Sequence, residues 1–315
     1  MSDVLATVGL GFAQVVLVVA LAPLFNGLVK TAKARLQGRE GPPVLQPYLD
    51  LWKLLRKDIV ASEHSSLVFR AAPAVYAASC LAAALLVPVL WLPAPLATWG
   101  DAILLVGLLA LGRFALAIAA LDTGSSFGGM GASREVAIAA LVEPALLLGI
   151  FAVALPGGGT DVSALAARLL ADPSSAIAPS QLLAFVALSV VLVAETGRVP
   201  VDNPDTHLEL TMIHEGMLLE HSGRALGILH WATLVKQLAL VALLIALFAP
   251  IGIALSAAAL PIAALALSVK LTVAAGALAL VESSGAKLRI LRVPELLGAA
   301  TALAALAVAA AVVVP

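Results

Sequence analysis

The sequence predicts an all-α, polytopic membrane protein with about eight transmembrane helices, and three observations lead to this expectation. First, 62% of the 315 residues are hydrophobic, only 12% are charged, and the mean hydropathy is +1.08. A soluble domain is roughly half apolar and a quarter charged, so this chain has more apolar surface than one core can bury. Second, apolar stretches of about 20 residues, the length that crosses a bilayer, recur along the chain. Third, basic residues collect in alternate loops.

The apolar stretches predict a single membrane domain over residues 1–315. The expected spans are approximately 4–29, 73–93, 101–121, 136–155, 181–196, 227–249, 256–281 and 295–314. The first stretch is too long for a signal-peptide core, and only Asp3 precedes it where a basic region would stand. We therefore expect it to be retained as a spanning helix. Pro88, Pro250 and Pro261 lie near or inside helix ends, which membrane proteins tolerate.

Lysine and arginine are concentrated in the odd-numbered loops. The first loop holds eight of them: Lys30, Lys33, Arg35, Arg39, Lys53, Arg56, Lys57 and Arg70. The third, fifth and seventh loops add Arg134, then Arg198 and Arg224, then Lys287, Arg289 and Arg292, whereas the even-numbered loops hold Arg168 alone. Because cytoplasmic loops carry the excess of basic residues, this distribution predicts cytoplasmic odd loops and both termini outside.

The first and third loops carry further signals. After a Gly-Pro turn, residues 46–60 place Leu49, Trp52, Leu55 and Ile59 at helical spacing, which predicts an amphipathic helix at the membrane interface. The alternative is a basic surface helix that only fixes topology. The third loop, 122–134, is rich in Gly and Ser. It lacks a following Gly-Lys-Ser/Thr and a preceding strand, so it predicts a tight turn rather than a phosphate cradle.

Several charged residues fall inside the expected spans, where each ionised group costs roughly 2.5–3.5 kcal/mol. These residues are Arg113, Glu135, Glu143, Glu195, Lys236, Lys270 and Glu282. Glu135 and Glu143 are eight residues apart and can face one interior cavity, and Glu195 could pair with Arg198 if its helix continues that far. Two interpretations stay open: paired ties between helices, or a proton relay whose pKa values burial brings toward neutrality. For the whole set we favour the relay.

The stretch 193–224 concentrates the titratable groups of the chain between two apolar runs. It contains Glu195, Asp202, Asp205, Glu209, Glu215 and Glu220, together with His207, His214 and His221. Histidines seven residues apart on one helix would be about 10.5 Å apart, too far to hold one metal ion. We expect this stretch to handle protons or to dock a partner, with neither a metal site nor a catalytic centre. Cys80 alone cannot hold a cluster, and a net charge of −1 argues against nucleic acid.

Three segments of the chain resemble a known family over about residues 30–295. They are AKARLQGREGPPVLQPYLDLWKLLRK from Ala32, SREVAIAALVEP from Ser133 and AETGRVPVDNPDTHLELTMIHEGMLLEHSGR from Ala194. They resemble the quinone-site membrane subunit of respiratory complex I. The string DNPDTHLELTMIHEGMLLEHSG is most similar to the membrane subunits of group 4 nickel–iron hydrogenases, of the formate hydrogenlyase and hydrogenase-4 type. Complex I subunits typically carry Asn where Gly197 stands and Tyr where His221 stands.

This resemblance implies a non-catalytic subunit of an oxidoreductase complex in the plasma (inner) membrane of a bacterium or archaeon. It would anchor a soluble arm and link electron transport there to proton or sodium translocation through antiporter-like membrane subunits. The nickel–iron centre and iron–sulfur clusters would belong to partner subunits, and this chain would bind no cofactor. The residues that match the family's acidic positions, implied as a proton path, are Glu135, Glu143, Glu195, Asp202, Glu209 and Glu220. The residues implied in docking the arm are Arg35, Arg39, Lys53, Lys57 and Arg198.

Two other functions are compatible with the sequence. One is the quinone-site membrane subunit of a complex I-type NADH dehydrogenase, which has the same fold. The other is an independent carrier with a midplane substrate site. Such carriers often consist of two related halves, and residues 1–155 and 156–315 show no internal repeat, which counts against the carrier.

Overall fold

The computed structural model describes residues 2–62, 65–203 and 212–313, without the side chains of residues 2–8, 10 and 257. The described residues form helices and connecting turns, with two isolated β-bridges, so the all-α prediction is confirmed. The long helices are α1 (Ser2–Leu36), α3 (Leu67–Leu86), α4 (Ala102–Asp122), α5 (Ser126–Ala154), α7 (Pro179–Glu195), α9 (Gly223–Phe248), α10 (Leu260–Ser284) and α11 (Val293–Val313). The shorter α-helices are α2 (Gln46–Leu55), α6 (Val162–Ala171) and α8 (His214–Leu218). Single 3₁₀ turns cover Ala97–Trp99, Leu155–Gly157, Pro173–Ile177, Ala257–Ala259 and Ile290–Arg292.

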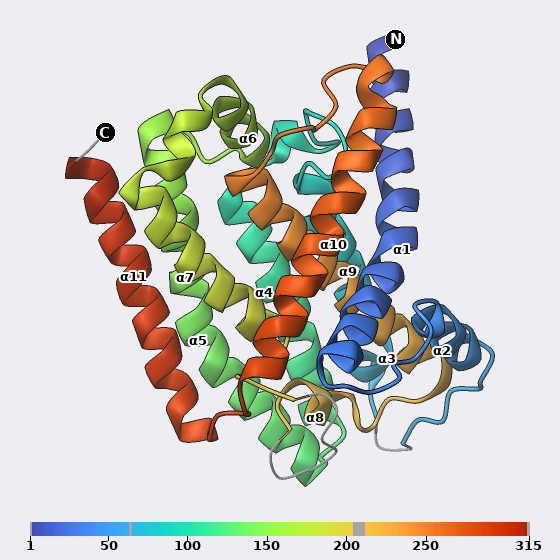
Figure 1. Ribbon diagram of the computed structural model, residues 1–315. Coiled ribbons are helices and arrows are strands. Elements are labelled where there is room, and N and C mark those ends of the chain that lie inside the picture. Colours follow the sequence, from blue (N-terminus) through green and yellow to red (C-terminus); the bar gives the residue numbers. More distant parts are fainter. Residues whose placement is uncertain (1, 63–64, 204–211, 314–315) are drawn as a thin grey trace.

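The long helices run alternately up and down through one bundle (Figure 1). The start of α1 and the end of α11 lie at the same end of the bundle, as an even number of crossings requires. In the described part of the chain, seven helices are long and apolar enough to cross a membrane. The remaining long helix, α7, has 17 residues, the lower limit for a span. The structure is therefore that of a polytopic membrane protein, and α2 and α8 lie at the end opposite the termini (Figure 1).

The Gly/Ser-rich third loop is mostly helical, so its prediction as a turn from 122 to 134 was wrong. Helix α4 ends at Asp122 and α5 already begins at Ser126. The glycines permit close packing here: a Cβ at Gly128 would lie 2.8 Å from the carbonyl oxygen of Ala120, and one at Gly131 would lie 2.9 Å from the Gly216 carbonyl carbon. They therefore let the extended N-terminal part of α5 approach α4 and α8.

The predicted amphipathic helix in the first loop is present as α2, although it ends at Leu55 rather than at Val60. Proline near its first turn suits a helix start, because an N–H there would have no intrahelical partner. Leu49 and Trp52 are 58% and 57% exposed, while Leu54 lies against Gly227 of α9. One side of α2 therefore rests on the bundle and an apolar side faces outward.

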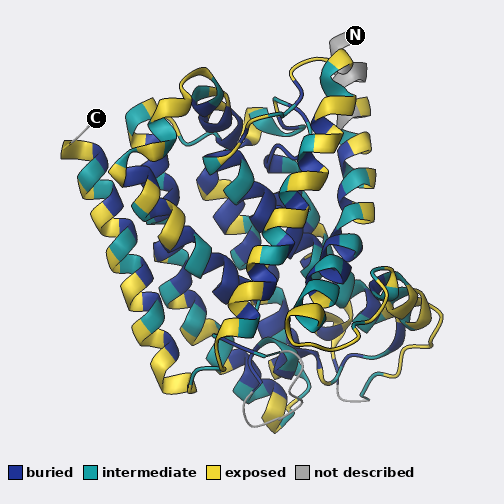
Figure 2. Cartoon of the chain, viewed as in Figure 1, coloured by how far each residue is buried: buried dark blue, intermediate teal, exposed yellow. Residues whose placement is uncertain are grey.

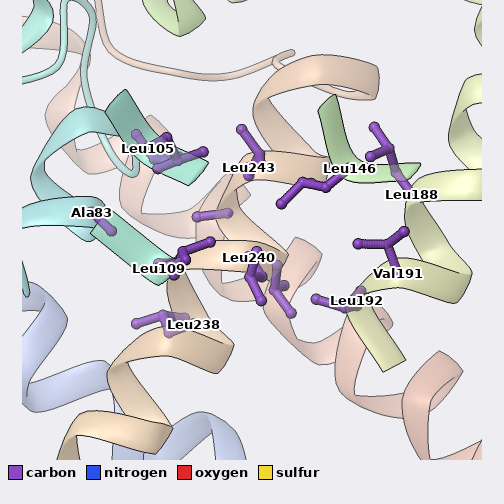
Figure 3. Close-up of a cluster of buried hydrophobic side chains, with 14 of the residues drawn as sticks. Ala83, Leu105, Leu109, Leu146, Leu188, Val191, Leu192, Leu238, Leu240 and Leu243 are labelled. Atoms are coloured by element: carbon purple, nitrogen blue, oxygen red, sulfur yellow. The ribbon is translucent and has the colours of Figure 1, made fainter. Parts of the chain in front are cut away.

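Helix α9 occupies the centre of the bundle. In its most apolar window 67% of the residues are buried, against 28% in α10 and in α11. Figure 3 shows Leu238, Leu240 and Leu243 of α9 among Leu105 of α4, Leu146 of α5 and Leu188 of α7. Exposed residues follow the outer sides of α10 and α11 (Figure 2). This core fixes α4, α5 and α7 around α9, and the charged residues described next belong to the same helices.

Candidate functional site

Charged side chains from α4, α5, α7 and α9 meet inside the bundle. The central charge cluster, as we call it, consists of Arg113, Glu135, Glu143, Glu195 and Lys236. Arg113 donates through Nη1 to Glu143 and through Nη2 to Glu195, and its Nε lies 3.7 Å from Glu135 Oε1. Its planar guanidinium presents five N–H donors, which suits several carboxylates at once. Because Arg113 is only 7% exposed, these partners replace the water that it loses on burial.

Lys236 supplies the second cation of the central charge cluster. Its Nζ lies 3.6 Å from Oε2 of Glu195, while Arg113 holds Oε1 of the same carboxylate. The Glu195 and Lys236 side chains are 2% and 5% exposed, whereas that of Glu143 is 34% exposed. Glu195 is therefore the most buried acid of the central charge cluster, and Glu143 is the most exposed.

A row of polar groups, which we call the polar row, consists of His214, Thr233 and Tyr76. It reaches the central charge cluster through His214, the first residue of α8. His214 Nδ1 lies 4.0 Å from Glu135 Oε1, and His214 Nε2 lies 3.4 Å from Thr233 Oγ1, which is 3.3 Å from the Tyr76 hydroxyl. Burial, and then the positive charge of Lys236, lower the pKa of His214 to about 4. His214 is thus neutral at pH 7, and its contact with Glu135 is not an ion pair at that pH.

A second group of charges, the α1–α10 ion cluster, consists of Lys33, Arg198 and Glu282 with Asn26. Arg198 donates through Nη1 to Glu282 and through Nη2 to Asn26 Oδ1 at 2.9 Å. Lys33 Nζ lies 3.1 Å from the other oxygen of Glu282. These contacts join α1 and α10 to the segment that follows α7.

Asp202 extends this arrangement toward His214. Lys287 donates to Asp202 Oδ1 at 2.6 Å, and the backbone N–H of Ile213 donates to Asp202 Oδ2 at 3.3 Å. Asp202 is 3% exposed. A buried carboxylate therefore fixes the residue that immediately precedes His214.

The turn after α7 directs neighbouring residues to different clusters. Gly197 has φ +59, and the N–H of Arg198 donates to the Val193 carbonyl at 3.0 Å, as in a glycine-capped helix end. The chain reverses at this turn, so Glu195 faces the central charge cluster while Arg198 faces α1 and α10. The expected Glu195–Arg198 pair does not form, because α7 ends at Glu195.

A cavity of about 410 Å³ lies between α1, α2, α8, α9 and this turn. Ionisable residues around it are Lys30, Asp50, Arg198, His214, Glu215 and His230. His214 and Thr233 line it and belong to the polar row, while Arg198 and Asn26 line it from the α1–α10 ion cluster. The cavity thus touches both groups of charges, and its volume lies in the range of roughly 300–1,000 Å³ typical of ligand pockets.

The structure brings together many of the residues singled out from the sequence. Glu135 and Glu143 do face a common interior point, since both contact Arg113. Glu195 contacts the same arginine, and Lys236 contacts Glu195. Glu282 belongs to the α1–α10 ion cluster instead, and Asp202 is held by Lys287 and the backbone of Ile213. Glu220 is half-buried beside His221, Lys270 is half-buried on α10, and Glu209 lies outside the described residues, as do Asp205 and His207.

The predicted docking residues divide into two sets. Arg35, Arg39, Lys53 and Lys57 are exposed around α2 and the end of α1. Arg198 is 8% exposed and its guanidinium is held by Glu282 and Asn26. The structure therefore places Arg198 inside the bundle, apart from the exposed basic residues.

His214 and His221 lie in different surroundings. The His221 ring stacks on Phe69 with centroids 4.1 Å apart, and neither ring nitrogen has a hydrogen-bond partner among the described residues. Burial lowers the pKa of His221 to about 4. Within the part of the chain that the structure describes, no three His, Cys, Asp or Glu side chains are grouped to hold a metal ion.

Sequence reasoning missed Tyr76, Thr233 and His230. Tyr76 and Thr233 stand singly in apolar helices, where such residues are ordinary, and His230 lies within a stretch expected to be lipid-embedded. A signal was available only for α9, where His230, Thr233 and Lys236 recur every three residues and so share one face.

Comparisons with known proteins place these observations in context. A family model described as NADH dehydrogenase matches residues 9–314. The chain is 38% identical to formate hydrogenlyase subunit 4 of Escherichia coli (strain K12) over 279 residues, which are 88% of this chain and 90% of that protein. It is 38% identical to hydrogenase-4 component C of the same organism over 240 residues, 76% of this chain and 75% of that protein.

Among solved structures, the chain resembles one from the membrane-bound sulfane sulfur reductase, an archaeal respiratory membrane complex. The TM-score is 0.83 at 22% sequence identity, covering 97% of this chain and 99% of that one. At this identity the likeness shows the fold.

Proposed function

The chain belongs to the NADH dehydrogenase family, and on that premise we propose that it is the membrane-anchoring and ion-coupling subunit of a multisubunit nickel–iron hydrogenase. The family resemblance inferred from its loop motifs is confirmed. The hydrogenase branch is supported by similarity, along most of the chain, to proteins named as subunits of formate hydrogenlyase and hydrogenase-4. The nickel–iron centre and the iron–sulfur clusters would lie in partner subunits, and antiporter-like subunits would continue the membrane arm.

The observation that carries the coupling role is the composition of the central charge cluster. It contains three carboxylates, Glu135, Glu143 and Glu195, but two cations, Arg113 and Lys236. With every group ionised the cluster has one excess negative charge in a medium where an uncompensated charge costs several kcal/mol. Taking up one proton removes this excess. A buried group of this composition is thus suited to bind and release a proton.

A route to the cluster is supported by the cavity and the polar row. His214 and Thr233 line the cavity, and His214 also lies 4.0 Å from Glu135. A proton that enters the cavity would reach Glu135 past His214 and then the carboxylates around Arg113. Glu143, the most exposed acid of the cluster, would pass it to a neighbouring subunit. Asp202, Glu209 and Glu220 would belong to the same path, as the family resemblance implies.

The end of the bundle that carries α2 and α8 would face the cytoplasm and the soluble arm. Its support is the density of basic residues, including the exposed Arg35, Arg39, Lys53 and Lys57. The outward apolar side of α2 fits the membrane interface. In this arrangement Arg198 positions α1 and α10 rather than contacting the arm.

A second candidate is the quinone-site subunit of a complex I-type dehydrogenase. The cavity of about 410 Å³ favours it by size. Its many ionisable lining residues fit a hydrated proton entrance better than an apolar quinone ring.

Affinity capture of this subunit from gently solubilised membranes tests the assignment. We expect co-purified nickel and a nickel–iron large subunit, identified by mass spectrometry and metal analysis. A nickel-free complex with NADH- or quinone-linked subunits would support the second candidate and overturn the hydrogenase assignment. Capture of the chain alone would instead indicate an independent carrier.

A further inference from the structure

Lys270 lies near the middle of a membrane-spanning helix. It stands ten residues after the first residue of α10, Leu260, and fourteen before the last, Ser284. At 1.5 Å per residue it is about 15 Å from one end of the helix and about 21 Å from the other. The hydrocarbon core of a bilayer is about 30 Å thick, so Lys270 is placed at mid-depth.

The described part of the chain offers Lys270 neither a carboxylate nor a hydrogen-bond acceptor within bonding distance. Other lysines do find acids: Lys33 pairs with Glu282, Lys236 with Glu195 and Lys287 with Asp202. Glu282, the acid on α10 itself, lies twelve residues further along and is already held by Arg198 and Lys33. A charged lysine at the bilayer centre is costly unless it is paired.

The side of α10 next to Lys270 is open and apolar. Ile262, Val269, Val273 and Leu280 are 69%, 56%, 66% and 59% exposed. Their spacing of seven, four and seven residues places them on one stripe, as in the contact seam of packed helices. We call these four residues the α10 stripe. Helix α10 contacts mainly α1, and Figure 2 shows exposed residues along its outer side.

We propose that the α10 stripe and Lys270 form a docking surface for a transmembrane helix of a partner subunit, and that this helix carries a carboxylate at mid-membrane. This rests on the proposed function only in that the chain belongs to a multisubunit membrane complex. The partner's Asp or Glu supplies the counter-charge that this chain lacks, and the stripe supplies the apolar seam on either side of the pair. A charge pair at one depth also fixes the register of the two helices.

A lipid headgroup does not meet the same requirement. Lysine can extend its four-carbon stem toward the interface, which is how lysines near helix ends reach water. From mid-depth the edge of the hydrocarbon core lies about 15 Å away and the phosphates lie beyond it, which is more than that stem can span. The counter-charge therefore has to come from inside the membrane.

A photocross-linking amino acid at Val273, one turn from Lys270, identifies what covers this surface in the intact complex. We expect a cross-link to a transmembrane peptide of another subunit with Asp or Glu within one turn of the linked position. The same probe at Leu306 of α11, 57% exposed, gives the yield at a comparably open site on another helix. A Val273 adduct with lipid alone, or with a helix that has no carboxylate near the link, would overturn the proposal.

Lys270→Met tests the charge without adding a polar group to the membrane. The partner acid would then be left unpaired, and we expect that partner to be retained at least about tenfold less tightly, which corresponds to about 1.4 kcal/mol. Changing the cross-linked acid to Lys in a Lys270→Glu background should restore retention. Unchanged retention in Lys270→Met would contradict the proposal. Nickel content and capture of the large subunit report separately on the hydrogenase assignment.

Discussion

Arg113 of α4 and Glu195 of α7 form a buried ion pair in which the carboxylate also faces a second cation. Arg113 holds Oε1 of Glu195, and Lys236 of α9 lies 3.6 Å from Oε2. Arg113 in turn holds Glu143 and approaches Glu135. The guanidinium therefore permits three carboxylates to lie close together inside the bundle. Its loss should destabilise the charged form of all three.

Replacing Arg113 by Met should strongly destabilise the protein. Three carboxylates would then share Lys236 as their only cation in the cluster, and breaking a buried pair typically costs about 3–5 kcal/mol. We expect a lower melting temperature of the purified protein and a lower yield. The melting temperature of Arg113→Lys should fall between those of Arg113→Met and the unaltered protein, because lysine keeps the positive charge but lacks the planar guanidinium. Arg35→Gln, at an exposed position, is the control and should melt like the unaltered protein.

Glu143→Gln should abolish ion coupling while the complex still assembles. The amide keeps the shape and a hydrogen bond to Arg113 but cannot take up a proton. Proton uptake into proteoliposomes that contain the purified complex is the measurement, with Glu40→Gln, an exposed site, as the matched control. Normal pumping by Glu143→Gln would remove Glu143 from the proton path. A complex that no longer assembles would support the other interpretation, in which the acid is a tie between helices.

His214, the first residue of α8, and His221, which follows that helix, should make the protein sensitive to acid. The folded-state pKa values of His214 and His221 are both about 4, below the ordinary value of about 6.5. Between these values the unfolded chain binds more protons, so the stabilisation present above about pH 6.5 is lost as the pH falls through 4. For His214 the effect is on the order of 3 kcal/mol.

Melting temperatures measured between pH 7.5 and pH 4.5 test this expectation. His221→Phe keeps the ring that stacks on Phe69 and removes two nitrogens that lack partners among the described residues. It should flatten the pH dependence without lowering the melting temperature at pH 7.5. His214→Gln should also flatten the pH dependence, because it removes the other buried imidazole. An unchanged slope in the double variant would show that other groups cause the acid sensitivity.

Gly197→Asn and Gly197→Val test the turn that separates the two charge clusters. With φ +59 this position favours Gly, and Asn is the side chain that tolerates it best. We expect the Asn variant to melt within a few degrees of the unaltered protein, and the β-branched Val variant to lose about 1–2 kcal/mol. Equal melting temperatures of the two variants would argue against this turn as the reason for glycine.

By itself the sequence determined the architecture and the family. Long apolar segments admit only lipid as solvent, so composition and segment length predicted the membrane bundle and the approximate position of each span. The loop motifs that begin at Ala32 and Ala194 were sufficient to indicate the family. The residues that carry charge inside the bundle, such as Arg113 and Lys236, could also be named, because an ionised group in an apolar helix is conspicuous.

Only the tertiary structure decided which of these charges meet. Arg113, Glu135, Glu195 and Lys236 are on four helices, and their rotation about their axes is set by the leucines and alanines packed around α9. Hydrophobic periodicity cannot supply that rotation here, since helices in lipid are apolar on every side. The same limit explains why the glycines at 128 and 131 indicated a turn: in sequence they break helices, whereas in the bundle they are positions where α4 and α8 leave no room for a Cβ.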